Sequence, residues 1–99
     1  MINLFKVLAN ENRLEILQVL KNPREHFKLL DIEPEVDTLG VCAGVLQRKM
    51  KLSQSTMSSF LNSLVKAELL IVTRNGQYTY YKRNEKTLKN LSVAVRENI

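Results

Sequence analysis

The sequence has very little of the residue types that cross-link small domains. It contains one cysteine, Cys42, and one histidine, His26. A disulfide within the chain needs two cysteines, and a structural zinc site needs four ligands from Cys and His, so both are excluded. The scarcity of cysteine fits a protein of a reducing compartment.

Long apolar runs are also missing. The longest are only a few residues, well short of the ~20 that cross a bilayer, and the start Met-Ile-Asn-Leu-Phe-Lys lacks the pattern of a secretory leader. We therefore expect a cytoplasmic protein without a membrane segment. The chain has 99 residues, of which 44% are apolar and 25% are charged. This composition predicts one globular domain over 1–99. A core this small buries little surface, so dimerisation would increase its stability.

Acidic residues are scarce in one half of the chain. Residues 41–83 carry a net charge of +6 with a single acid, Glu68, whereas residues 23–40 carry −3. A basic stretch of this kind indicates a surface for a polyanion such as nucleic acid. A basic surface that only keeps the protein soluble would have the same net charge. The sequence motifs must therefore distinguish a polyanion-binding surface from a solvated one. The cations are Arg48, Lys49, Lys51, Lys66, Arg74, Lys82 and Arg83.

The spacing of apolar residues predicts five helices, over residues 2–9, 11–21, 41–50, 54–66 and 85–98. Asn10 and Ser53 are natural N-caps for the second and fourth of these. Residues 23–40 contain both prolines and predict a loop with a turn of helix around 24–30. We expect the acids of this loop to be solvated, although binding a cation or a partner is open to them; they are Asp31, Glu33, Glu35 and Asp37.

An extended hairpin follows the fourth helix. The runs 69–74 and 77–83 are rich in β-branched and aromatic residues, and Asn75-Gly76 lies between them. Both central positions of a type I′ turn need positive φ, which Asn and Gly adopt readily, so this dipeptide predicts a two-stranded hairpin. Its tip is flanked by Arg74 and Gln77.

The order helix, tight turn, capped helix and hairpin predicts a helix-turn-helix over about 41–67 with a β wing over about 69–83. The fold class is thus mainly α with a small β hairpin. No carboxylate occurs from Ser53 to Ala67, although exposed helices usually carry Glu–Lys pairs. Short hydroxyl and amide side chains suit a surface that lies against phosphates and base edges, where a Glu would repel.

We therefore predict a sequence-specific regulator that binds double-stranded DNA. The candidate DNA-binding residues are Lys49, Lys51, Ser53, Gln54, Ser55, Thr56, Ser58, Ser59, Asn62, Lys66, Arg74 and Gln77. The sequence does not predict an enzyme, because it lacks the residues of an active site. Cys42 and His26, the one candidate nucleophile–base pair, are sixteen residues apart, and the sequence has neither a glycine-rich phosphate-binding loop nor a convincing pair of carboxylates. The alternative is a winged-helix module that docks proteins, but a docking face needs an aromatic or aliphatic anchor.

Three motifs resemble the ArsR/SmtB family of small dimeric bacterial winged-helix repressors, over nearly the whole chain. Residues 8–17, LANENRLEIL, are similar to the early L-A-[DN]-x-x-R-L-x-I-L motif of the family. Residues 52–58, LSQSTMS, resemble its recognition-helix signature, and Arg74-Asn75-Gly76 with Tyr80-Tyr81 resembles its wing. The resemblance implies a repressor that binds an inverted repeat.

The resemblance also implies a homodimer joined by the first and last helices, over 2–9 and 85–98. The terminal apolar stripes agree, because a monomer this small would leave them exposed, unless they pack on its own core. The expected interface residues are Leu4, Phe5, Leu88, Leu91 and Val95, and Ile99 continues the last stripe.

The chain lacks the residues with which many family members bind metals. Some members use the two cysteines of a C-V-C pair, but here the matching positions are Gly40-Val41-Cys42. Others use Asp and His ligands on the last helix, but residues 84–99 contain neither. We therefore expect no metal and no cofactor, and the inducer is not readable from the sequence. Cys42 lies at helical spacing with Leu46 and Met50, which favours a small buried apolar residue over a redox switch. Ser59 and Phe60 differ from the family too, which affects the preferred DNA sequence.

Overall fold

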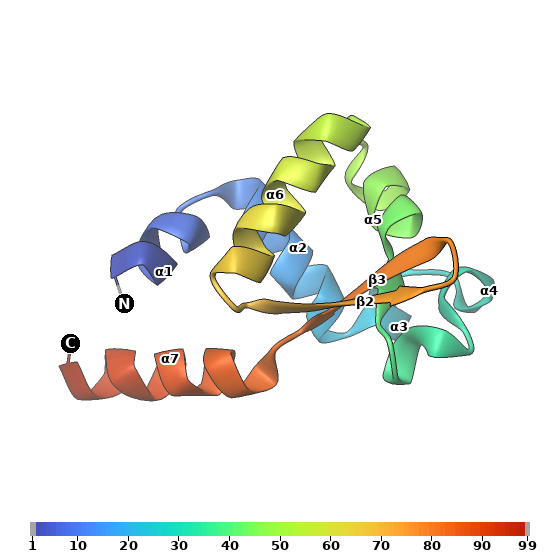
Figure 1. The fold of residues 1–99 in the computed structure, drawn as a ribbon. Coiled ribbons are helices and arrows are strands. Elements are labelled where there is room, and N and C mark those ends of the chain that lie inside the picture. Colours follow the sequence, from blue (N-terminus) through green and yellow to red (C-terminus); the bar gives the residue numbers. More distant parts are fainter. Residues whose placement is uncertain (1, 99) are drawn as a thin grey trace.

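The computed structural model describes residues 2–98, and its elements follow the expected order (Figure 1). Ile99, and with it the end of the last predicted stripe, lies outside the described residues. The helices are α1 (Ile2–Leu8), α2 (Glu11–Lys21), α3 (Pro23–His26), α4 (Leu29–Ile32), the 3₁₀ turn η1 (Glu35–Asp37), α5 (Ala43–Met50), α6 (Gln54–Lys66) and α7 (Glu85–Asn98). The strands are β1 (Val41–Cys42), β2 (Leu70–Asn75) and β3 (Tyr78–Arg83).

The long helices begin where their caps predict. The Asn10 side chain accepts a hydrogen bond from the backbone N–H of Arg13 at 3.0 Å, and Ser53 does the same for Thr56 at 3.2 Å. Each bond satisfies one of the free N–H groups of a first helical turn. The predicted loop over 23–40 contains more helix than expected, since α3, α4 and η1 all lie in it. Helix α3 begins at Pro23, a residue that suits the first helical position.

The helix expected over 41–50 begins two residues later, because Val41 and Cys42 form a strand. They pair antiparallel with Tyr81 and Tyr80 of β3, so the sheet has three strands in the order β1-β3-β2 rather than the two predicted. Gly40 permits this pairing: its φ is +102°, and a Cβ there would lie 2.1 Å from the carbonyl oxygen of Tyr81.

The turn of the hairpin lies one residue later than predicted. Asn75 pairs with Tyr78, so the two loop residues are Gly76 and Gln77. Only Gly76 of these has positive φ, +63°. This is the pattern of a type II′ turn, which has glycine at the first central position. Like the type I′ turn, it commonly joins the two strands of a hairpin.

The core lies where α2, α5 and α6 meet the sheet. Ile16, Leu46 and Leu64 are completely buried, one from each helix, together with Val41 of β1 and Leu69. The inner face of α6 has helical spacing, as predicted: Met57, Leu61 and Leu64 are buried. Burial of this face fixes which side of α6 is left for solvent.

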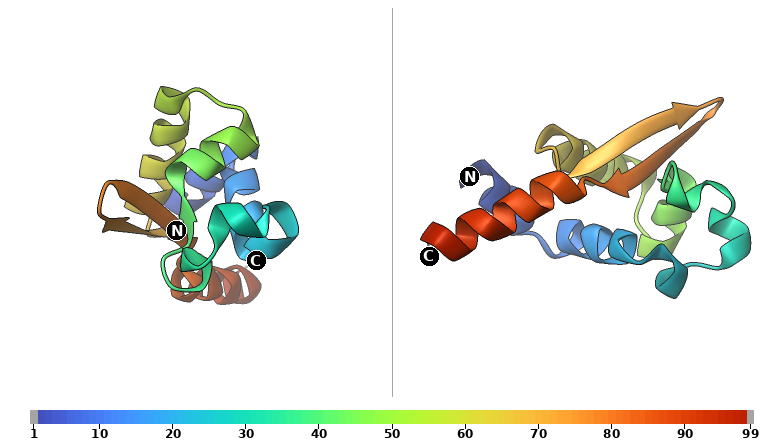
Figure 2. Two further views of the ribbon diagram at one scale, coloured as in Figure 1. Left: turned by 90° about the vertical axis from the view of Figure 1, so that its right-hand side faces the viewer. Right: turned by 90° about the horizontal axis from the view of Figure 1, so that it is seen from below.

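The molecule is elongated, measuring 42 × 26 × 24 Å. Helix α1 and the C-terminal part of α7 lie at one end, and α4 and the hairpin tip lie towards the other (Figures 1 and 2). Helix α6 and the hairpin share one side of the molecule, opposite α3 and α4 (Figure 2, left). Within residues 2–98, no helix has both the length and the hydropathy that crossing a bilayer requires.

Candidate nucleic-acid interface

Helix α6 follows α5 after a turn of three residues. Lys51 adopts the left-handed conformation, with φ +56°, and its N–H donates to the carbonyl oxygen of Gln47 at 2.9 Å. Ser53 then caps α6. Its hydroxyl also lies 2.9 Å from that of Thr56. The hydroxyls of Ser53 and Thr56 therefore stabilise the first turn of α6 and also lie on the exposed surface.

All twelve residues predicted to contact DNA have exposed side chains. Those on α6 lie opposite the buried Met57, Leu61 and Leu64. A shallow hollow runs along this outer face, and it is lined by Ser55, Ser58, Ser59, Asn62, Ser63 and Lys66. Neither an acid nor a large apolar side chain lines it, so the surface offers hydroxyl, amide and ammonium groups only.

Ser63 is the one residue of the hollow that the sequence prediction missed. It follows Ser59 by four residues, so the same helical spacing that selected Ser55 and Ser59 would have found it. Its side chain is half-buried, unlike its neighbours in the hollow.

The wing carries Arg74 and Gln77 at its tip, both exposed, with Tyr78 beside them at 52% exposure. The strands that hold them are paired along their whole length, from Leu70 with Arg83 to Asn75 with Tyr78. The tip is thus presented by a regular hairpin, on the same side of the molecule as α6 (Figure 2, left).

The basic stretch over 41–83 divides into two groups in the structure. Lys82 and Arg83 lie at the root of the hairpin, where Lys82 Nζ donates to the carbonyl oxygen of Thr38 at 3.1 Å. Arg83 binds the carbonyl oxygen of Leu17 at 3.4 Å and pairs with Glu85. These two cations stabilise the fold. The remaining five, Arg48, Lys49, Lys51, Lys66 and Arg74, are exposed.

The acidic segment lies away from α6, and part of it is paired internally. Arg24 binds both carboxylate oxygens of Asp37, at 2.7 and 2.9 Å, and one oxygen of Glu33. The hydrogen bonds from Arg24 hold the pKa of Asp37 below its ordinary value, and the bonds to Asp37 and Glu33 raise the pKa of Arg24. Both carboxylates are exposed, as expected for solvated acids, and in addition they pair with Arg24, which the sequence analysis did not predict.

Cys42 is half-buried and lines a cleft with Tyr80 and Arg48, among others. Burial, followed by the nearby charge of Glu35, raises the pKa of Tyr80. Burial likewise raises the pKa of Tyr81. Within residues 2–98, no group of three or more His, Cys, Asp and Glu side chains is placed to hold a metal ion.

The apolar residues predicted for a dimer lie at the end of the molecule formed by α1 and α7. Phe5 is 40% exposed, and Leu4, Leu88 and Val95 are half-buried, whereas Leu91 is buried at 9% exposure. Arg13 fixes α1 to the body: it donates to the carbonyl oxygens of residues 6 and 7, and its guanidinium lies 5.9 Å from the centre of the Phe60 ring.

No protein-family model matches the chain. It is 44% identical over 91 residues to the uncharacterized HTH-type transcriptional regulator YbzH of Bacillus subtilis strain 168, covering 92% of this chain and 90% of YbzH. Among solved structures it is similar to the transcriptional regulator HlyU from Vibrio vulnificus CMCP6, at 26% identity and a TM-score of 0.62, covering 99% of this chain and 86% of HlyU.

The chain is also similar in fold to NolR from Sinorhizobium fredii, at 24% identity and a TM-score of 0.62, covering 97% of this chain and 81% of NolR. These similarities cover between 92% and 99% of this chain. The chain therefore belongs to the helix-turn-helix transcriptional regulators, as a winged-helix DNA-binding regulator of the ArsR/SmtB type.

Proposed function

We propose that this protein is a homodimeric repressor that binds an inverted-repeat operator, with one α6 in the major groove of each half-site. The observation that carries the proposal is the outer face of α6, which is exposed along its length and has no carboxylate from residue 53 to residue 67. A groove of DNA surrounds a helix with phosphates and base edges, so such a face fits it without repulsion.

The side chains divide into two roles in this proposal. Gln54, Ser55, Ser58, Ser59 and Asn62 read base edges, since amides form paired hydrogen bonds with adenine and hydroxyls bond to several bases. The cations bind phosphates, which contribute affinity without sequence information. Ser53 and Thr56 contact phosphates at the start of α6, and Gln77 does so from the wing; the phosphate-binding cations are Lys49, Lys51, Lys66 and Arg74.

The dimer joins α1 and α7 of one subunit to those of the other. Phe5 leaves 40% of its side-chain surface in solvent, and α7 projects from the body with the half-buried Leu88 and Val95 along one stripe. A second copy would cover this surface, which a two-fold axis makes self-complementary. Half-sites on one face of the duplex then lie roughly 34–36 Å apart. The protein represses by occupying a promoter in the cytoplasm.

The proposal is tested by selecting bound duplexes from genomic DNA with the purified protein and measuring affinities for the selected site and a random duplex. We expect a near-palindromic site. Gln54→Ala should reduce the preference for that site by roughly 1–3 kcal/mol per contacted base, while Lys66→Ala should weaken both duplexes alike. Equal losses on both duplexes for Gln54→Ala contradict its reading role.

Sedimentation at micromolar concentration tests the dimer separately. We expect a mass of twice 11.4 kDa for the free protein. A monomer under those conditions contradicts the proposed interface.

A further inference from the structure

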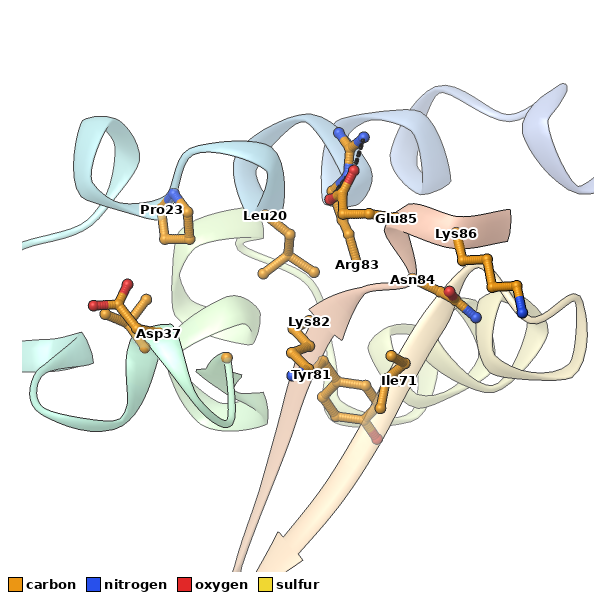
Figure 3. Close-up of a pocket in the computed structure, with 12 residues that line it drawn as sticks. Leu20, Pro23, Asp37, Ile71, Tyr81, Lys82, Arg83, Asn84, Glu85 and Lys86 are labelled. Carbon is orange, nitrogen blue, oxygen red and sulfur yellow. Dashed lines mark hydrogen bonds and ion pairs between the residues drawn. The ribbon is translucent and has the colours of Figure 1, made fainter. Parts of the chain in front are cut away.

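A cleft of about 430 Å³ lies between the root of the hairpin and the first turn of α7 (Figure 3). Its volume is within the range of small-molecule sites, roughly 300–1,000 Å³. Apolar side chains from four different parts of the chain line it: Leu20, Pro23, Val36 and Ile71. None of the side chains proposed to contact DNA lines this cleft.

The two acids of the cleft are already neutralised by arginines of the same subunit. Arg24 binds both oxygens of Asp37. Arg83 Nη2 donates to Glu85 at 3.1 Å, and its Nε lies 2.9 Å from the second oxygen as an ion pair (Figure 3). Neither carboxylate is therefore left to attract a cationic ligand.

The two lysines of the cleft are not neutralised in this way. Among the residues that the structure describes, Lys82 and Lys86 form no ion pair, and the Lys82 ammonium donates only to the neutral carbonyl of Thr38. Asn84 lies beside Lys86 at one end of the cleft (Figure 3). Its Oδ1 accepts from the N–H of Thr87, which leaves its amide N–H groups free to donate.

We propose that this cleft binds a small organic carboxylate with an apolar body, and that this ligand regulates DNA binding. The apolar part lies against Leu20, Val36 and Ile71, and the carboxylate accepts bonds from Lys86 and Asn84, which lie together at one end of the cleft. Ligand sites of this size combine a mostly apolar lining with a few polar groups that fix orientation. The regulatory part of the proposal rests on the proposed DNA-binding function.

The position of the cleft connects binding to regulation. One wall belongs to the hairpin, whose tip carries Arg74, and another to the first turn of α7, the helix of the proposed dimer. A ligand between them contacts both the wing and the helix that sets the distance between two recognition helices. If the ligand changes DNA affinity by some factor, DNA must change the ligand's affinity by the same factor.

The first experiment measures binding without DNA, by following backbone amide signals of the full chain in two-dimensional NMR as octanoate is added. We expect saturable shifts at Gly40, Ile71 and Lys86. Three comparison probes are used. Acetate lacks the apolar tail of octanoate, 1-octanol lacks its charge, and octylammonium carries the opposite charge. Octanoate should bind more tightly than all three.

Two pairs of variants locate the site. Ile71 and Val72 are neighbours on β2 with 40% and 42% exposure, but only Ile71 lines the cleft. Ile71→Ser should weaken octanoate binding severalfold, and Val72→Ser should not. Lys86 and Lys89 are both exposed on α7, and only Lys86 lines the cleft. Lys86→Gln should weaken binding by roughly twofold to fivefold, and Lys89→Gln should leave it unchanged.

The second experiment repeats the DNA titration with saturating octanoate, where we expect the affinity for the selected duplex to change by about fivefold or more. Octanoate binding with unchanged DNA affinity overturns the regulatory part. Absence of octanoate shifts, equal binding of 1-octanol, or equal losses in both members of a variant pair overturns the site. Because the NMR experiment contains no DNA, its outcome is independent of the proposed repressor function.

Discussion

Replacement of Lys66 by alanine gives a quantitative test of how α6 meets DNA. Lys66 is exposed in the last turn of α6 and lines the outer hollow of that helix. It forms no ion pair within residues 2–98, so its removal leaves no buried charge and should not disturb the fold. Its contribution is electrostatic attraction to a phosphate, and this type of contact is measured by the salt dependence of binding.

The magnitude follows from the number of exposed cations at the proposed interface. Each subunit presents four, Lys49, Lys51, Lys66 and Arg74, and a dimer presents twice as many. Each neutralised phosphate contributes about −0.9 to the slope of log K against log salt concentration, so the slope should be about −7. Affinity should then fall roughly 10⁴-fold between 50 and 200 mM salt. Lys66→Ala removes one contact per subunit and should change the slope to about −5.

The assay is a fluorescence anisotropy titration of the selected duplex at four or more salt concentrations. Lys89→Ala is the matched control, because Lys89 is an equally exposed helical lysine on α7. It should keep the slope of the unmodified protein. A slope that Lys66→Ala does not change, or that Lys89→Ala changes by the same amount, refutes the placement of α6 against phosphates.

Two further predictions concern the fold around the interface. Arg24 holds the pKa of Asp37 below its ordinary value, so the stabilisation from this pair is present at neutral pH and is lost as pH falls through the lowered pKa. Arg24→Gln should raise the pKa of Asp37 in a carboxyl ¹³C NMR titration, and identical midpoints would disprove the pairing. Ser53→Ala should lower the free energy of unfolding by about 1 kcal/mol in urea titrations, since it removes the N-cap. Ser59→Ala, at an exposed position within the same helix, should not, and a Ser53→Ala variant as stable as the unmodified protein contradicts the cap.

The helices and the face of α6 were predictable because their signals are local. Asn10 and Ser53 mark helix starts by their own side chains, and Met57, Leu61 and Leu64 show the helical period without reference to the rest of the chain. The outer face of α6 follows from the inner one, so the candidate residues on it were all found exposed.

The features that the sequence left undetermined depend on distant partners. Val41 fits a helical stripe with Val45 equally well, and only pairing with Tyr81, forty residues later, makes it a strand. The turn position depends on the strand register that pairs Val72 with Tyr81, while a dipeptide with glycine is compatible with two turn types. The cleft beside α7 is built from four separate segments, and no local pattern brings them together.

The most direct test of the central claim is to place a carboxylate on the outer face of α6. Ser58→Glu introduces a negative charge at an exposed position of the hollow, and Asn90→Glu introduces the same charge at an exposed position of α7, on the side of the helix away from Leu88 and Val95. Because like charges at an interface cost several kcal/mol, Ser58→Glu should lower the affinity for the selected duplex by about tenfold or more. Asn90→Glu should bind like the unmodified protein. Full affinity of a folded Ser58→Glu variant would contradict the account.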